Sequence, residues 1–225
     1  DFNSTNGIGY FENTNPDFPM KSGVILSTGD VLKAEGPNEP FPVLSDGSLS
    51  WDGDKALEKV LSDAGIPEVT KNASIIEFDF TPISSKFSFE FLFASEEYGN
   101  NQCDFSDAFA FLLTNEATGE TINLAVVPNT TTPISVVTIR NMLYNSKCSS
   151  QNEEYFGRFN GGSNASTSAT NFNGATVLLN ASATLVVNQK YHIKLVIADR
   201  KDNEFDSAIF IASDTFNIGQ NVLGE

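Results

Sequence analysis

The stretch "FSFEFLF", residues 87–93, decides the fold that this sequence predicts. Phenylalanine occupies every second position, and Ser88, Glu90 and Leu92 stand between the rings. Successive side chains of a β-strand point to opposite faces, so this period of two predicts a strand whose aromatic face is buried. Residues 74–80, "SIIEFDF", alternate in the same way, and "TPISS" separates the two stretches. We therefore expect these two strands to form an antiparallel hairpin.

On both sides of this pair, the sequence pattern predicts short strands over most of the chain. Candidates share β-branched or aromatic composition and polar or turn-forming ends, and they are residues 23–28, 108–114, 123–128, 134–139, 175–179, 191–198 and 207–213. Residues 51–65 break the pattern with apolar residues at helical spacing and a terminal Gly65, which predicts one short helix. The sequence predicts an all-β fold, a β-sandwich or jelly roll of antiparallel strands, as a single domain over residues 1–225.

The polar stretch at residues 160–174, "NGGSNASTSATNFNG", is expected to be a long mobile loop inside this domain, because strand patterns resume on both sides. The chain starts at Asp1 with no signal-like segment before it, so we expect a mature or excised piece of a larger protein.

Charge restricts the partners of this protein. Among its 225 residues, 29 acidic and 13 basic side chains give a formal net charge of −16. Such a surface repels phosphate backbones and anionic lipid headgroups, so nucleic acid is a poor partner. No stretch approaches eighteen consecutive apolar residues, which argues against direct membrane insertion.

The two cysteines, Cys103 and Cys148, both lie in polar, loop-like sequence. A disulfide is the simplest interpretation and would indicate an oxidising compartment, while two separate reduced thiols are the alternative.

Acidic side chains gather at two strand ends. "FASEEYGNNQCDFSDAF", residues 93–109, follows the phenylalanine strand, and "ADRKDNEFDSA", residues 198–208, follows another. If these strands are neighbours, the two acidic loops meet at one end of the sandwich. Three interpretations compete for them: a cation site, a pair of catalytic carboxylates, or a solvated acidic rim.

Calcium fits the acidic loops best among metal ions. Ca²⁺ takes six to eight oxygen ligands from carboxylates, amides and carbonyls, whereas a single histidine and two cysteines suit transition metals poorly. Neither loop matches the EF-hand pattern. The predicted oxygen donors are Glu96, Glu97, Asp107, Asp199, Asp202 and Asp206, with Asp104 as a weaker candidate.

Motifs along the chain resemble the choice-of-anchor L domain family. They are "SGVILSTGDV", "GPN", "SIIEFDFTP", "FSFEFLFASEEY", "DAFAFLL", "NLAVVP" and "YHIKLVIADRKDNEFDSAIFI", in this order over about residues 23–216. Ser106 departs from the asparagine that is common in the family's "NDVFAF" motif, so one amide ligand is missing. The resemblance implies a bacterial cell-surface or secreted protein with an adhesin-like setting, and it implies no catalytic residues.

Three functions remain open from the sequence. The first is a calcium-stabilised binding module of a surface adhesin that recognises an extracellular glycan, peptide or solid surface and adjoins further domains of a long chain. The second is a structural spacer. The third is a glycoside hydrolase that pairs Glu96 or Glu97 with Asp206. His192 alternates within a strand and Trp51 precedes the helix, so we expect a surface and a core role for them, and we expect no enzyme.

Overall fold

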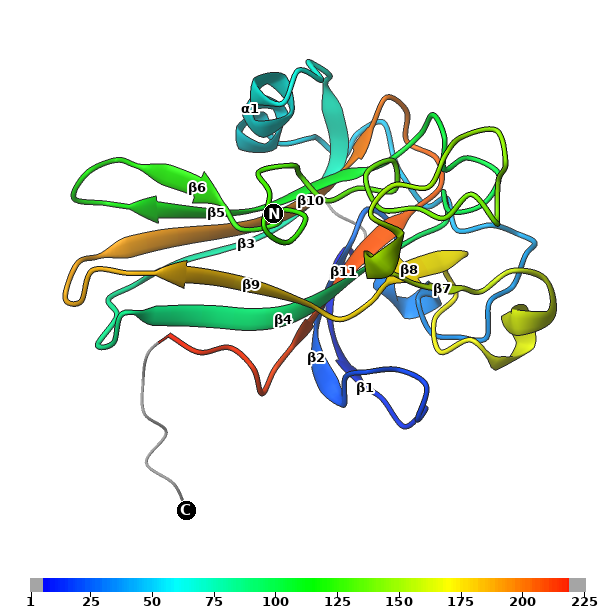
Figure 1. The fold of residues 1–225 in the computed structure, drawn as a ribbon, viewed down its shortest axis with the longest axis horizontal. Coiled ribbons are helices and arrows are strands. Elements are labelled where there is room, and N and C mark those ends of the chain that lie inside the picture. Colours follow the sequence, from blue (N-terminus) through cyan, green and yellow to red (C-terminus); the bar gives the residue numbers. More distant parts are fainter. Residues whose placement is uncertain (1–5, 219–225) are drawn as a thin grey trace.

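Two antiparallel sheets pack against each other in the computed structural model, which describes residues 6–218 (Figure 1). The larger sheet has the order β1-β2-β11-β4-β8-β7, and β9 also pairs with β4. Its strands are β1 (Ile8–Glu12), β2 (Ser22–Ser27), β4 (Lys86–Ser95), β7 (Phe156–Phe159), β8 (Gly174–Thr176), β9 (Leu179–Thr184) and β11 (Ser207–Ala212). The smaller sheet has the order β3-β10-β5-β6, with β3 (Thr70–Phe80), β5 (Ala108–Asn115), β6 (Thr121–Asn123) and β10 (Tyr191–Arg200). The predicted all-β sandwich is confirmed.

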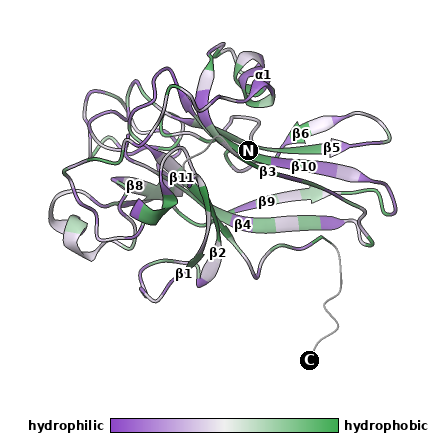
Figure 2. Ribbon diagram, turned by 180° about the vertical axis from the view of Figure 1, so that it is seen from behind, coloured by the Kyte–Doolittle hydropathy of each residue, from purple (hydrophilic) through white to green (hydrophobic). Residues whose placement is uncertain are grey.

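The phenylalanine face of β4 forms the centre of the core between the sheets. Phe87, Phe89, Phe91 and Phe93 are each exposed by 1% or less. The Phe91 ring lies 4.8 Å from that of Phe111 on β5, which belongs to the opposite sheet. In Figure 2 the hydrophobic colour follows the central strands, and the hydrophilic colour is common in the loops. The predicted inward face of this strand is confirmed.

The predicted hairpin between residues 74–80 and 87–93 is wrong. β3 pairs with β10, whereas β4 pairs with β11, β8 and β9, so the connection between β3 and β4 passes from one sheet to the other. The reason is that both strands carry an apolar face, and these faces bury each other across the core. The rings of Phe80 and Phe87 accordingly stack at 5.3 Å.

Four other segments differ from the prediction. Residues 134–139 form turns in place of a strand, although Val136 and Ile139 are buried in the core. The predicted strand at 123–128 is replaced by β6, which ends at Asn123, and that at 175–179 divides into β8 and β9. The stretch 160–174, predicted as a long mobile loop, contains the 3-10 helix η3 (Gly162–Thr167) and the buried ring of Phe172.

The predicted helix is present as α1 (Lys55–Asp63) on the outer face of the smaller sheet. Asp54 caps it by accepting a hydrogen bond from the Leu57 N–H at 2.8 Å. Leu57 and Leu61 are its buried residues, and Gly65 ends it with φ +81°. Trp51 is buried before this helix, where its indole N–H donates to the Ala73 carbonyl, as its predicted core role requires.

The disulfide between Cys103 and Cys148 is present, with Cα atoms 5.6 Å apart. It joins the loop after β4 to a segment 45 residues further along the chain. Asn145 reinforces this junction by donating to the carbonyls of Gly99 and Asn100 at 2.9 and 3.0 Å.

Candidate metal centre

The two acidic loops lie at the same end of the sandwich. Ser95 at the end of β4 is opposite Ser207 at the start of β11, and Ala108 at the start of β5 is opposite Ala198 near the end of β10. The loops 96–107 and 201–206 therefore both pass from one sheet to the other at this end (Figure 1). They meet as predicted, although as connections between sheets instead of neighbouring hairpins.

Five of the seven predicted donors are brought together and buried there. Each is exposed by 2% or less, and they are Glu96, Glu97, Asp107, Asp199 and Asp206. The other two lie outside this group. Asp104 is exposed, its N–H donates to the Asn101 carbonyl, and its own carbonyl accepts a hydrogen bond from Lys201. Asp202 is half-buried, and its carboxylate accepts a hydrogen bond from the Glu204 N–H.

Backbone N–H groups hold three of the buried carboxylates in place. Glu97 Oε2 accepts the Asp107 N–H at 2.8 Å, and Glu96 Oε1 accepts the Leu44 N–H at 3.1 Å. Both oxygens of Asp206 lie 3.0 Å from the Asp46 nitrogen, and Asp46 itself forms an ion pair with Lys33. These bonds fix the carboxylates in position, but a single N–H does not neutralise a carboxylate charge.

Several buried oxygens at this end accept no hydrogen bond of ordinary length and angle within the described part of the chain. Both carboxylate oxygens of Asp199 are of this kind, as are Asp107 Oδ2, Glu96 Oε2 and the amide oxygen of Asn72. Buried polar atoms are nearly always hydrogen-bonded, so five such oxygens at one end of a fold are unusual.

Three oxygens of different chemical types converge beside Gly47. A methyl group on the Gly47 Cα would lie 2.5 Å from the Asn203 carbonyl oxygen, 2.7 Å from Asn72 Oδ1 and 3.1 Å from Asp199 Oδ2. Asn72 is fully buried on β3 with φ +52°, a conformation that asparagine tolerates better than most residues. Only glycine leaves room at position 47 for this group of a carboxylate, an amide and a carbonyl oxygen.

Burial dominates the electrostatics of the cluster. It raises the pKa of Glu96 and of Asp206 to about 7, that of Glu97 to about 8 and that of Asp199 to about 9. Burial and the neighbouring Glu97 carboxylate raise the pKa of Asp107 well above its ordinary value. The nearby Thr28 hydroxyl lowers the pKa of Asp199 in opposition to burial, and neighbouring carboxylates raise it further, with the Asp206 charge first among them.

One buried cation lies beside the cluster. Arg200, at the end of β10, lowers the pKa of Glu97, in opposition to the larger effect of burial. Its guanidinium donates to the Ser106 carbonyl at 2.7 Å and forms an ion pair with Glu68 at 2.7 Å. Since Glu68 already balances it, Arg200 compensates little of the charge of five carboxylates.

The donor chemistry fits a hard cation, although the coordination shell is not closed. Among the described residues, no group of three His, Cys, Asp or Glu side chains is arranged to hold a metal ion. Binding would therefore require carboxylates to turn toward one another and toward the Asn72 and Asn203 oxygens. Carboxylate, amide and carbonyl oxygens together are the ligands that Ca²⁺ takes in proteins.

Sequence reasoning missed Asn72, Gly47, Asp46 and Arg200. Asn72 interrupts an otherwise β-forming run, and Gly47 follows an aspartate in "SDGS", yet such signals occur in many turns. Their place beside residues more than a hundred positions away depends on sheet pairing, which no local pattern reveals.

The fold and this centre define the class of the protein as an antiparallel β-sandwich module with a buried acidic centre between its sheets. The model of the choice-of-anchor L domain family matches residues 1–217, and the chain belongs to that family. Membership implies a bacterial cell-surface or secreted protein. No curated protein and no solved structure gives a significant match. The described residues include no helix with the length and apolar character needed to cross a membrane.

Proposed function

We propose that this chain is a calcium-stabilised extracellular binding module of a bacterial surface adhesin. The observation that carries the proposal is Asp199, which is fully buried with both carboxylate oxygens unpartnered in the described structure and which faces further oxygens beside Gly47. Family membership supports the surface setting, and the disulfide agrees with an oxidising compartment.

The uncompensated charge of the buried carboxylates supports a bound cation. Several ionised carboxylates cannot share a buried site without compensation, so they either take up protons or bind a cation. Arg200 is already paired with Glu68, so it leaves most of this charge uncompensated. Calcium would neutralise the cluster and use the oxygens that have no other partner.

Burial also favours a cation over the alternative of a glycoside hydrolase. The pair proposed for hydrolysis, Glu96 or Glu97 with Asp206, must contact a sugar on both sides of the scissile bond. All three side chains are exposed by only 2%. A metal ion does not need the open cleft that a polysaccharide substrate needs. These carboxylates therefore suit a metal centre better than a catalytic cleft.

The test is thermal unfolding in calcium and in chelator, with sodium chloride used to match the ionic strength. A ligand of the native state stabilises it by RT ln(1 + [L]/Kd), about 2.7 kcal/mol at a hundredfold excess over Kd. We expect calcium to raise the melting temperature by several degrees and Asp199→Asn to remove most of that increase.

Asp104→Asn is the matched control, because it makes the same change at an exposed carboxylate of the loop 96–107, at the same end of the sandwich. It should leave the calcium response intact. Equal melting temperatures in calcium and in chelator would refute the cation centre, as would equal responses of the two variants.

A further inference from the structure

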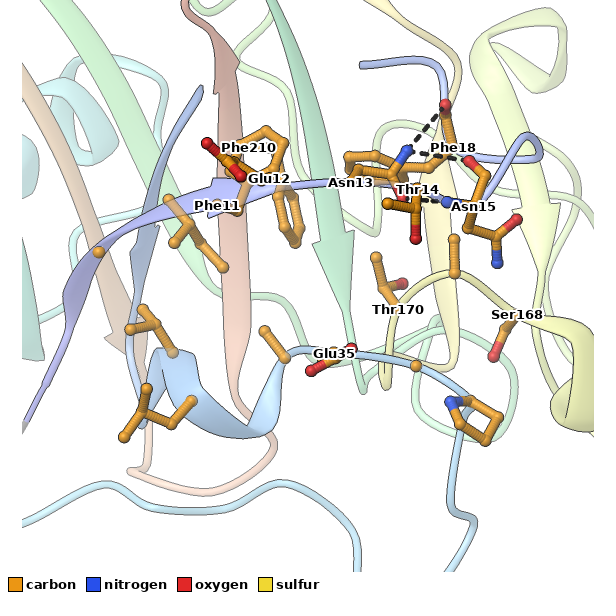
Figure 3. A pocket seen from close by; sticks show the side chains of 18 of the residues that line it. Phe11, Glu12, Asn13, Thr14, Asn15, Phe18, Glu35, Ser168, Thr170 and Phe210 are labelled. Atoms are coloured by element: carbon orange, nitrogen blue, oxygen red, sulfur yellow. Dashed lines mark hydrogen bonds between the residues drawn. The ribbon is translucent and has the colours of Figure 1, made fainter. Parts of the chain in front are cut away.

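A groove of about 690 Å³ lies on the outer side of the larger sheet and is lined by none of the five buried carboxylates (Figure 3). One wall is β1 with the loop that follows it, and the opposite wall is the segment 31–37, which contains the 3-10 helix η1 (Val31–Lys33). Residues 166–170 close one end. Its volume is within the range of ligand-binding clefts in proteins.

One edge of β1 has no partner strand among the described residues. β1 is the last strand of its sheet, and of the described strands it pairs with β2 alone. The Gly7 carbonyl accepts from Ser27 on the β2 side, whereas the Asn6 carbonyl accepts from Val31 on the other side. Because alternate residues of a strand direct their N–H and C=O groups to opposite edges, those of Ile8, Tyr10 and Glu12 lie on the edge toward segment 31–37. No described strand pairs with that edge.

The floor of the groove is apolar, and its rim carries both polar and apolar side chains. Phe11, Phe18 and Phe210 form edge-to-face contacts at the floor, with centroids 5.1 to 5.8 Å apart. At the rim, Tyr10 is 63% exposed and Leu32 is 76% exposed. Apolar side chains gathered around an open cleft typically mark an interaction site.

Charge in the groove has one sign. Of the described residues, Glu12 and Glu35 line it, and no lysine, arginine or histidine does. Neither glutamate forms an ion pair within the described residues. With a net charge of −16 for the whole chain, the groove favours a partner with basic side chains and disfavours an anionic one.

We propose that this groove binds an extended segment of a partner protein, in which apolar and basic residues alternate, as an additional strand on the free edge of β1. Backbone hydrogen bonds to Ile8, Tyr10 and Glu12 would supply affinity, as in other cases of strand addition. Apolar side chains of the segment face the phenylalanine floor, and its lysine or arginine residues reach Glu12 and Glu35. The free backbone edge favours a peptide over a saccharide, because a peptide alone matches its alternating donors and acceptors. The proposal names the ligand class of the binding module and rests on that part of the proposed function, but not on calcium.

A displayed library of random twelve-residue peptides tests the proposal, with the wild-type protein as target. We expect the enriched peptides to alternate apolar and polar residues with an excess of lysine and arginine. Synthetic copies should protect the N–H groups of Ile8, Tyr10 and Glu12 from hydrogen exchange.

Tyr10→Pro removes one N–H from the free edge, and proline is tolerated on the open side of an edge strand. Tyr10→Ala is its matched control, because it removes the same ring and keeps the N–H. We expect the proline variant to bind about tenfold more weakly than the alanine variant, since a lost backbone hydrogen bond costs roughly that factor.

The double variant Glu12→Gln and Glu35→Gln tests the charge of the groove and should bind the peptides more weakly at low salt. Methylation of alternate backbone nitrogens of the peptide tests the backbone hydrogen bonds without altering the protein.

Equal binding by the proline and alanine variants, or no enriched peptides, would overturn the proposal. Binding of a neutral oligosaccharide such as cellohexaose at this groove, with no effect of Tyr10→Pro, would replace it with a saccharide site. Peptide binding measured in calcium and in chelator, both below the melting temperature, separates the two proposals. Absence of peptide binding in both media would refute the peptide site in the groove. Absence of any effect of calcium on the melting temperature would refute the metal centre.

Discussion

Asp199 combines complete burial, two unpartnered oxygens and several acidic neighbours. A carboxyl group in this position has only two states of low free energy, protonated or bound to a cation. Single residues of this centre should therefore make the stability of the protein depend on both pH and calcium.

Without calcium, we expect the melting temperature to fall as the pH rises from 5 to 9. The folded-state pKa values are raised, to about 7 for Glu96 and Asp206, about 8 for Glu97 and about 9 for Asp199. Protonation of these groups thus contributes stability that is fully present below their ordinary pKa values, near 4, and is lost as the pH rises through 7 to 9. Thermal melts in chelator at pH 5, 7 and 9 measure this.

Saturating calcium should flatten the same profile, because the cation takes the place of the protons that the folded protein otherwise holds. The increase in melting temperature on adding calcium should consequently grow with pH. Asp199→Asn should reduce the slope in chelator. A melting temperature that rises with pH over this range in chelator would contradict the raised pKa values.

At the scale of elements, β4 determines how the two sheets pack. It pairs with β11, β8 and β9 within its sheet. In the opposite sheet, the rings of Phe89, Phe91 and Phe93 contact rings of β5, and that of Phe87 stacks on a ring of β3. Its last residues lead directly into Glu96 and Glu97, so the packing of β4 also positions the acidic centre.

Phe91→Ala should reduce the free energy of unfolding by about 3 to 5 kcal/mol, as deletion of a buried aromatic ring does. Phe91 is 1% exposed and contacts the rings of Phe89, Phe109 and Phe111. Urea unfolding measures the change. Phe41→Ala, at a ring that is 88% exposed, is the matched control and should change stability by less than about 0.5 kcal/mol. A loss below about 1 kcal/mol for Phe91→Ala would mean that the ring is not part of a packed core.

At the scale of the whole molecule, the disulfide links the acidic centre to a distant part of the chain. Cys103 belongs to the loop that carries Glu97 and Asp107, and Cys148 lies 45 residues further along. Arg140 and Gln102 support the same junction, since Gln102 donates to the Asn141 carbonyl at 2.9 Å and Arg140 to the Gln102 carbonyl at 3.5 Å.

Removing the bond with Cys103→Ser and Cys148→Ser together should cost about 4 kcal/mol, the loop-closure value for a ring of this size. Because the freed loop carries two carboxylates of the centre, calcium should also stabilise this variant less than the wild type. Reductant should lower the melting temperature of the wild type and leave the double variant unchanged. Thiols that react with iodoacetamide in the unfolded, non-reduced wild type would show that the bond does not form.

The sequence by itself determined the all-β class, the inward face of β4, the helix α1 and the presence of two acidic loops. Each of these follows from patterns within about fifteen residues, because side chains alternate along a strand and repeat along a helix. The same patterns led to the family resemblance that the family model confirms. They failed at residues 134–139, where apolar residues fill the core from turns.

Only the tertiary structure decided which strands pair and which residues complete the acidic centre. Alternation tells which face of a strand is apolar but not which strand lies beside it, so β3 and β4 were wrongly joined. Asp199 is opposite Lys71 in the sheet, which brings the neighbouring Asn72 toward it, and Asp206 meets Asp46 from 160 positions away. The free edge of β1 likewise exists because β1 is last in the strand order. These features depend on long-range pairing, which is settled by burial over the whole chain and leaves no signal in any short stretch.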